Sequence, residues 1–227
     1  MIPLVRTAPS SPPSSSQRPL LELQRAHRAC RRCVDAGFIE RAHPVLSGHA
    51  AQRILLVGQA PGPVETDQTR PFAGRAGKEL MRWMVRAGFA DEAEVRDTVY
   101  MTAMTTCFPG RRPSGGGDRR PSAREVALCA PWLDELLDVL RPRLIIVVGS
   151  LALSRFLPGR RLDDVVGNAY TLRGEVAPRD PAGVTLVPLP HPSGQSRWLN
   201  DASRRAVLVK ALGRLARLRQ WACGSAV

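Results

Sequence analysis

Four of the five cysteines in this chain have the chemistry and spacing of a metal-binding group. Cys30 and Cys33 form a C-x2-C pair that can grip one side of a metal centre, and Cys107 and Cys129 follow much later. Four thiolates suit either a tetrahedral zinc ion or an iron–sulfur cubane. The alternative is that Cys107 and Cys129 are simply small buried residues, because only the first two form a paired motif. Cys223, near the C-terminus, is predicted to be a bystander.

Two loops carry a second set of residues that could do chemistry, and each loop follows an apolar run. The stretch GQAPGPVETDQTRPFAGRAG (58–77) directly follows RILLV and holds two glycine-proline turns, a glutamate and a phenylalanine. The stretch LPHPSGQSRWLN contains His191, the only one of the four histidines that follows an apolar run and precedes Pro-Ser-Gly. Such loops usually hold a ligand, since a backbone free of bulky side chains can approach it closely.

Alternating strands and helices should position these loops. Apolar runs predict core strands at 53–58, 98–106, 143–150 and 183–189 and an edge strand at 169–176, whereas helical patterns cover 21–37, 77–89, 122–142, 150–157 and 201–220. The alternation predicts an α/β fold, a three-layer αβα sandwich with a central, mainly parallel four-stranded sheet. Ligands bind beyond the carboxyl ends of such strands, so the two loops should converge in space.

The composition favours a nucleic-acid partner. The formal charge is +13, and nearly all of the excess is arginine, which suits bidentate phosphate contacts. The alternative is that a genome rich in G and C has favoured Arg over Lys. No run approaches the roughly 18 apolar residues of a membrane span, and the N-terminus lacks the apolar stretch of a secretory signal. We therefore expect a cytoplasmic, nucleoid-associated monomer with no membrane partner.

The domain organisation predicted from composition is simple. Residues 1–19 are rich in Pro and Ser and indicate a disordered lead-in, 20–222 a single domain, and 223–227 a tail. In a chain without an export signal, cysteines are expected to serve as metal ligands or reactive thiols rather than in disulfides.

In order and spacing, these motifs resemble those of the uracil-DNA glycosylases, specifically the iron–sulfur branch called family 4. That family has GE[AG]PG, an acidic stretch, GRPF and a G-x-AG helix start, which correspond to GQAPGPVETDQTRPFAGRAG here. Its N-x-x-K-C strand end, Pro/Arg loop and later cysteine correspond to TAMTTCFPGRRPSGGGDRRPSAREVALC, and its HP[SA] loop to LPHPSGQSRWLN. The resemblance extends from about Cys30 to the last helix.

The resemblance implies a DNA repair enzyme that flips a deaminated base, uracil above all, out of DNA and hydrolyses its N-glycosidic bond. It implies that the four thiolates hold a [4Fe–4S] cluster, a structural staple for the basic loop. His191 is the expected donor to the departing base, and Glu65 matches the family's water-associated acidic position. Phe72 is the expected stacking platform, although an ordinary core aromatic is the alternative. The rest of the base pocket is predicted to be Gly58, Gln59, Ala60, Pro61, Gly62 and Ala103.

Several residues are predicted to contact the DNA backbone. Ser193, Gly194 and Ser196 can bind phosphates, and Arg197 or Trp198 could fill the gap left by the flipped base. A mobile basic loop suited to phosphate contains Arg111, Arg112, Arg119 and Arg120, which flank a triple glycine. The alternative interpretations are a solvated charge for Glu65 and a merely soluble loop for the arginines. Lys78 is the only lysine in either pocket loop and should face away, so a monofunctional enzyme is expected.

Three departures from the family pattern bear on specificity. Gln59 replaces the glutamate of GE[AG]PG, Ala60 stands where the GQDPYH-type glycosylases have their catalytic aspartate, and Ala103 replaces an asparagine that binds the pyrimidine edge in relatives. Two alternatives therefore stay open: an iron–sulfur protein that binds damaged bases in DNA without excising them, and a glycosylase for hypoxanthine or xanthine. A Rossmann-like nucleotide enzyme is disfavoured because no G-x-G-x-x-G or G-x-x-x-x-G-K-[ST] occurs.

Overall fold

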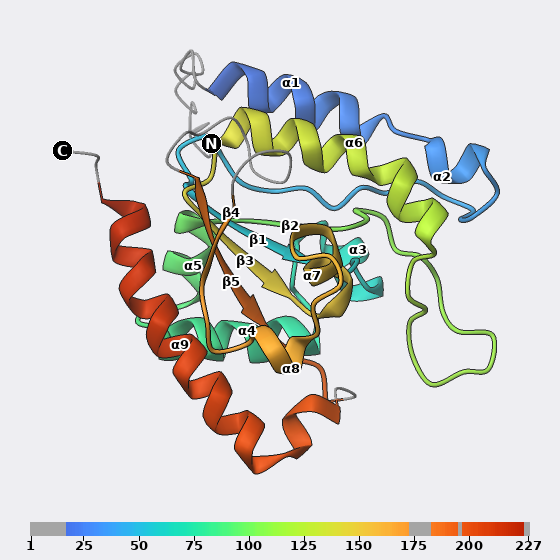
Figure 1. The fold of residues 1–227 in the computed structure, drawn as a ribbon. Helices are drawn as coiled ribbons and strands as arrows, with labels where there is room; N and C mark the ends of the chain where they lie inside the picture. The colour runs from blue at the N-terminus through green and yellow to red at the C-terminus, as the bar shows by residue number, and fades with distance from the viewer. Residues whose placement is uncertain (1–16, 173–182, 195–196, 225–227) are drawn as a thin grey trace, which may run out of the picture.

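The computed structural model describes residues 17–172, 183–194 and 197–224 (Figure 1). Five strands within these ranges form one sheet in the order β2-β1-β3-β5-β4. They are β1 (Ile54–Gly58), β2 (Val99–Ala103), β3 (Leu144–Val148), β4 (Tyr170–Leu172) and β5 (Val184–Leu189). The first three and β5 run parallel, and β4 pairs antiparallel with β5. The predicted mainly parallel sheet is confirmed, with β4 as a fifth strand at the predicted edge.

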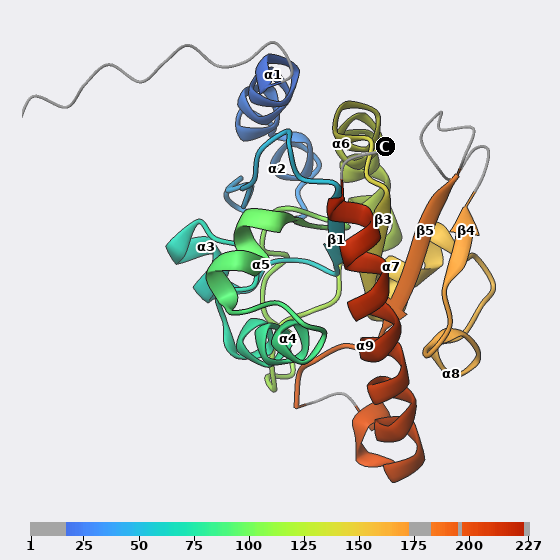
Figure 2. The same ribbon diagram turned by 90° about the vertical axis from the view of Figure 1, so that its left-hand side faces the viewer.

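Helices cover both faces of the sheet because successive side chains of each buried strand point to opposite faces. Ile54 and Leu56 pack in one apolar cluster, and Leu55 and Val57 pack in another. The first cluster includes side chains of α4 (Arg75–Arg86), α5 (Glu92–Thr98) and α9 (Ala202–Cys223). The second includes side chains of α1 (Gln17–Arg28), α6 (Ala123–Leu140) and α7 (Ser150–Phe156). Figure 2 shows the resulting three layers, which confirm the predicted αβα sandwich.

Four short helical segments lie in the connections: α2 (Arg32–Asp35), α3 (Pro63–Gln68), α8 (Leu162–Val165) and η2 (Arg197–Asn200). The helix predicted over 21–37 is therefore interrupted, and Cys30 lies between α1 and α2. Neither α3 nor α5 was expected, although the Asp91 side chain accepts a hydrogen bond from the Glu94 N–H at 2.8 Å and so caps α5.

The limits of the domain differ slightly from those predicted. The last three residues of the predicted lead-in, 17–19, belong to α1, and the rest of it lies outside the described residues. At the other end, α9 continues through Cys223, where the tail was predicted to begin. In the part of the chain that the structure describes, no helix is both long enough and apolar enough to cross a membrane.

Candidate functional site

The two candidate loops leave the sheet at the same edge. Gly58 ends β1, Gly149 directly follows β3, and His191 lies two residues beyond the end of β5. Because β3 pairs with both β1 and β5 in parallel, the three strand ends are neighbours. Adjacent strands lie about 4.8 Å apart, so the loops begin within roughly 10 Å of each other. The strand order thus brings the GQAPG and HPSG loops together as predicted.

The hydrogen bonds of His191 define its tautomer. The backbone N–H of Ser193 donates to Nδ1 at 3.2 Å, so Nδ1 is an acceptor and carries no proton. The Ser193 hydroxyl, 2.9 Å from the same nitrogen, must then also act as a donor. Burial lowers the pKa of His191 below its ordinary value of 6.5. The imidazole is therefore neutral at pH 7 and presents its remaining proton on Nε2, as a hydrogen-bond donor.

Gly149, which directly follows β3, lies beside this imidazole. Its φ is +86°, in the left-handed region that favours glycine, and its amide donates to the Leu189 carbonyl at 3.0 Å. A β-carbon placed on Gly149 would lie 3.4 Å from Cδ2 and 3.5 Å from Cβ of His191. The imidazole thus lies beside the end of the neighbouring strand.

Phe72 lies over the end of β1. A β-carbon on Gly58 would be 2.7 Å from Cζ of the phenyl ring, so only glycine lets the ring approach the strand this closely. The ring is partly buried against the cluster that contains α4 and α9. In the adjacent strand, Ala103 pairs with Gly58, and the following amides of Met104 and Thr105 donate to the Gly58 and Gln59 carbonyls at 3.0 and 3.3 Å. These contacts hold the GQAPG backbone against β2.

Glu65 holds two backbone positions of its own loop. Its Oε1 accepts a hydrogen bond from the Gly74 N–H at 2.7 Å, and its Oε2 accepts one from the Gly62 N–H at 3.1 Å. The local sequence explains the second bond, because Pro63 suits the first position of α3 and a glutamate two residues later can cap the helix start. Both carboxylate oxygens are thus engaged with main-chain donors, a role that sequence reasoning did not anticipate.

The four predicted metal ligands line a single cavity. Cys30, Cys33, Cys107 and Cys129 surround about 430 Å³ of space, part of it open to solvent, between α1, α2, α6 and the end of β2. All four are free thiols. Cys129 lies within α6, as predicted, and Cys107 follows β2 by four residues. Among the described residues, no three Cys, His, Asp or Glu side chains converge as ligands of a single metal ion.

The thiols of this cavity are difficult to ionise together. Burial and, to a smaller extent, the mutual repulsion of neighbouring thiolates raise the pKa of Cys107 to about 12 and that of Cys33 to about 11. Burial also raises the pKa of Cys129. Four thiolates can therefore coexist here only beside a positive centre, which is what a bound metal group supplies.

Hydrogen-bond donors surround the same cavity. The Trp132 indole donates from Nε1 to Cys30 Sγ at 3.3 Å, and the Thr106 hydroxyl lies 3.8 Å from Cys129 Sγ. Thr105 Oγ1 is buried without a hydrogen-bond partner in the described part of the chain, and Thr105 is one of the residues that line the cavity. A buried unpaired hydroxyl is uncommon, and a sulfur-rich group in the cavity would give it an acceptor. The donor set therefore fits an iron–sulfur cluster.

Comparison with known proteins identifies the family of this chain. A family model described as the uracil DNA glycosylase superfamily matches residues 47–216. The chain belongs to that superfamily. A type-4 uracil-DNA glycosylase of Pyrobaculum aerophilum is 30% identical over 69% of this chain and 77% of the relative, and one of Thermotoga maritima is 31% identical over 71% and 75%. A type-5 uracil-DNA glycosylase of Pyrobaculum aerophilum is 31% identical over 64% of this chain and 63% of that protein.

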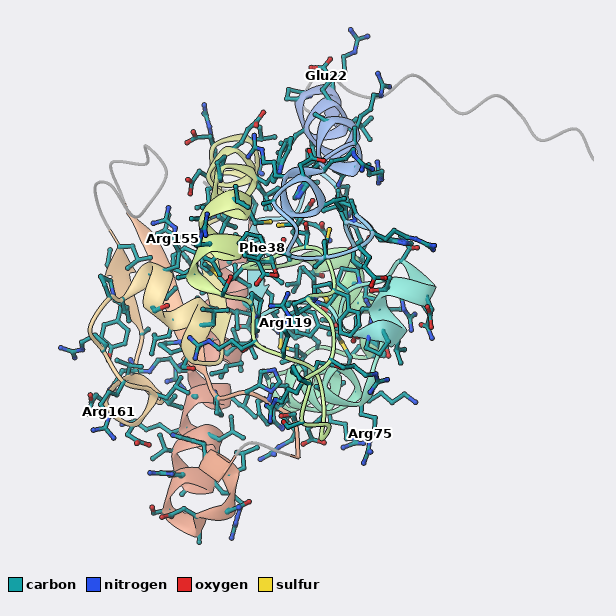
Figure 3. The ribbon with its side chains drawn as sticks, turned by 90° about the vertical axis from the view of Figure 1, so that its right-hand side faces the viewer. Glu22, Phe38, Arg75, Arg119, Arg155 and Arg161 are labelled. Atoms are coloured by element: carbon teal, nitrogen blue, oxygen red, sulfur yellow. The ribbon has the colours of Figure 1, made fainter. Side chains whose placement is uncertain are left out.

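The basic loop of this superfamily member is more ordered than predicted. An antiparallel bridge joins Arg111 to Asp118, and the Arg112 amide donates to the Gly117 carbonyl at 3.0 Å. The side chains of Arg111, Arg112 and Arg120 are exposed, as phosphate contacts require. Both ends of the loop lead to the cavity, one through Cys107 and the other through Cys129. Figure 3 faces the loop and labels Arg119 on it and Arg75 at the start of α4.

The guanidinium of Arg119 is not free, because it makes structural hydrogen bonds. Its Nη1 and Nη2 each donate to the Glu125 carboxylate at 2.7 Å, and Nη2 also donates to the Phe38 carbonyl at 3.1 Å. Glu125 is buried and is the third residue of α6, which Ser122 caps. Arg119 thus ties the basic loop to the helix that carries Cys129, and we no longer assign it to phosphate.

The residues after His191 are only partly described. Ser193 contacts the histidine, and Gly194 is exposed. Ser196 lies outside the described residues, and for Arg197 only the backbone, at the start of η2, is described. Trp198 is 8% exposed and packs in the core beside α9. A wedge must reach into the base stack, so this placement of Trp198 argues against that role and leaves Arg197 as the candidate.

Proposed function

We propose that this chain is a monofunctional DNA N-glycosylase that flips uracil out of DNA and hydrolyses its N-glycosidic bond, leaving an abasic site. The observation that carries the proposal is the tautomer of His191, whose Nδ1 accepts from Ser193 and whose Nε2 therefore donates. The names of the relatives, the exposed arginines of the basic loop and the formal charge of +13 support DNA as the substrate.

The geometry supports a mechanism based on stabilisation of the leaving group. A uracil everted into the site would stack on Phe72 and meet the backbone of the GQAPG loop. As the bond between C1′ and the base breaks, its electron pair goes to the base, and His191 Nε2–H stabilises the developing charge on the base oxygen. The sugar acquires oxocarbenium character, water adds its oxygen to C1′, and the proton that this water loses neutralises the departing uracil anion. Because both oxygens of Glu65 bind main-chain amides, we assign Glu65 to shaping the loop rather than to activating water.

We further propose that Cys30, Cys33, Cys107 and Cys129 hold a [4Fe–4S] cluster. Support comes from their common cavity, from the cost of ionising them without a positive centre, and from the unpaired Thr105 hydroxyl. When bound, the cluster would supply a structural cross-link between the segment that leads into α2, α6 and both ends of the basic loop. Protein purified without oxygen should be brown and contain about four iron and four sulfide per chain. A colourless protein with stoichiometric zinc would overturn the assignment.

The decisive experiment uses a uracil-containing oligonucleotide followed by alkali, which cleaves the strand at abasic sites. Cleavage at the uracil position supports excision, and tight binding without cleavage supports the alternative of a damage-binding iron–sulfur protein. Ala103 and Gln59 make base specificity the next question, since neither reproduces the family's residue. A panel of oligonucleotides with uracil, hypoxanthine, xanthine or mispaired thymine separates uracil excision from altered specificity.

A further inference from the structure

Phe72 has a backbone conformation that needs an explanation. Three non-glycine residues in the described ranges have positive φ: Thr69 at 48°, Phe72 at 53° and Arg141 at 48°. Thr69 and Arg141 are the C-caps of α3 and α6, where a left-handed residue is common. Phe72 ends no helix. A bulky residue remains in this region only when its surroundings determine it, and such strain concentrates at functional sites.

Two glycines make room for this conformation. Gly58 lets the phenyl ring rest on the end of β1. Gly77, in the first turn of α4, lies so close to the Phe72 backbone that a β-carbon there would be 1.9 Å from the Phe72 carbonyl oxygen. Any side chain at either position would displace Phe72. The glycines permit the conformation, but space alone does not hold the residue in it.

Arg96 supplies the holding contacts. From α5, its Nη1 donates to the Pro71 carbonyl at 3.0 Å, and its Nη2 donates to the Phe72 carbonyl at 3.3 Å. Its Nε donates to Glu92 at 2.7 Å, which fixes the guanidinium plane, and the side chain is only 20% exposed. A planar guanidinium can serve two successive carbonyls and a carboxylate at once, whereas a lysine ammonium is a single point charge.

Glu65 restrains the same segment from the other side. Its bond to the Gly74 N–H lies two residues beyond Phe72, and its bond to Gly62 ties that point to the start of the loop. The segment from Pro71 to Gly74 is therefore pinned to α5 at one end and to α3 at the other. Phe72 lies between the two clamps, so both act on the backbone that carries its ring.

We propose that Arg96 is a positioning residue for base excision: it holds the Phe72 backbone in the left-handed conformation that aims the phenyl ring at the everted base. The inference rests on the proposed function in one respect, the stacking of the base on Phe72. A platform that is fixed in advance loses no conformational freedom when the base arrives, and misplacing it by an ångström is costly.

The test compares Arg96→Lys with Arg70→Lys. Arg70 also faces Glu92, at 3.8 Å, but in the described part of the chain its guanidinium has no hydrogen bond to the Phe72 carbonyl, so it controls for the change of charge pairing at Glu92. We expect Arg96→Lys to lower kcat/KM for uracil excision between about tenfold and a hundredfold and Arg70→Lys to leave it unchanged. If Arg96→Lys does not fold, Arg96→Gln, which keeps one amide donor, takes its place.

Two further measurements make the result specific. In a Phe72→Leu background, Arg96→Lys should cause little further loss, because Arg96 acts through the ring; fully additive losses would overturn the proposal. Hydrogen exchange of the segment 71–74 should be faster in Arg96→Lys than in Arg70→Lys, and equal exchange would also overturn it. If the unmodified protein excises no uracil, the proposed function has failed, and the exchange measurement still decides whether the clamp exists.

Discussion

At the carboxyl edge of the sheet, the groups that would meet the base already have their partners: Ser193 fixes His191, and Arg96 and Glu65 fix the loop around Phe72. The cysteine cavity is different. Its thiols resist ionisation, and Thr105 has an unpaired hydroxyl. The proposed reactive edge is thus built from the chain's own hydrogen bonds, whereas the cavity is proposed to be completed by a bound group. Losses in the cavity should therefore affect stability, and losses at the edge should affect turnover.

The largest expected effect, on the free energy of unfolding, comes from removing one cysteine thiol of the cavity. Cys107→Ser removes one thiolate of the proposed cluster, and loss of a metal group is among the few changes that cost on the order of 4 kcal/mol of the free energy of unfolding. Denaturant unfolding under anaerobic conditions, together with iron content, measures this. Cys223→Ser is the matched control, since Cys223 is exposed and outside the cavity. Full iron content in Cys107→Ser would remove Cys107 from the ligand set.

A change at the carboxyl edge of the sheet should instead lower turnover and leave stability nearly unchanged. His191→Ala removes the Nε2 donor, and loss of one preorganised donor to a developing anion typically lowers kcat about 100- to 1,000-fold. Stability and binding to undamaged duplex should change little. His49→Ala is a suitable control, because that side chain is 43% exposed and its Nε2 lies 3.0 Å from the carbonyl oxygen of Asp97, near the C-terminal end of α5. Unchanged excision by His191→Ala would show that the donor lies elsewhere.

Features of the fold that follow local rules could be predicted from the sequence. Runs such as 54–57 and 144–148 are uninterrupted and apolar, and the parallel order of β1, β3 and β5 brings His191 and the GQAPG loop to one edge. The helix predicted over 122–142 begins at the capping box of Ser122 and Glu125, two residues that lie three positions apart. These features follow local rules, in which a side chain or a periodicity acts within a few residues.

Other features depend on contacts between distant residues and left no local signal. Nothing in the sequence around Arg96 indicates that its guanidinium reaches the carbonyl of Phe72, 24 residues earlier. Arg119 looked like one of several loop arginines until its contacts with Glu125 and the Phe38 carbonyl were seen. Trp198 looked like a surface wedge but is buried, because η2 packs against the start of α9.

A smaller change at the carboxyl edge tests whether the Phe72 ring is held in its position before the base binds. Gly58→Ala places a β-carbon 2.7 Å from Cζ of Phe72, so the ring must move. We expect kcat/KM to fall about tenfold, since small misplacements of contacting groups are costly. Gly213→Ala is the control: it lies within α9 with no atom near its β-carbon, and it should stabilise the protein by about 1 kcal/mol. Unchanged kinetics of Gly58→Ala would mean that Phe72 does not contact the base.

The pH dependence sharpens the assignment of the neutral imidazole. Burial lowers the pKa of His191 below 6.5, so the unfolded chain binds its proton more readily than the folded one. The stabilising contribution is thus complete above about pH 6.5 and is lost as the pH falls further. Protonation of Nδ1 would also turn a proton toward the Ser193 N–H. The acid limb of kcat should therefore lie below the ordinary histidine range, and a midpoint above 6.5 would contradict a buried neutral His191.

The smallest expected effect separates the two donors that fix this tautomer. Ser193→Ala removes the hydroxyl that lies 2.9 Å from Nδ1 but keeps the backbone N–H at 3.2 Å. A hydrogen bond of this kind contributes about 1 kcal/mol, so kcat should fall only severalfold. Because the main-chain donor alone still requires Nδ1 to be an acceptor, the proton should stay on Nε2, which nitrogen-15 shifts of the imidazole can verify. A loss as large as that of His191→Ala would mean that the hydroxyl, rather than the main chain, sets the tautomer, and the edge would then depend on one side chain instead of on the fold.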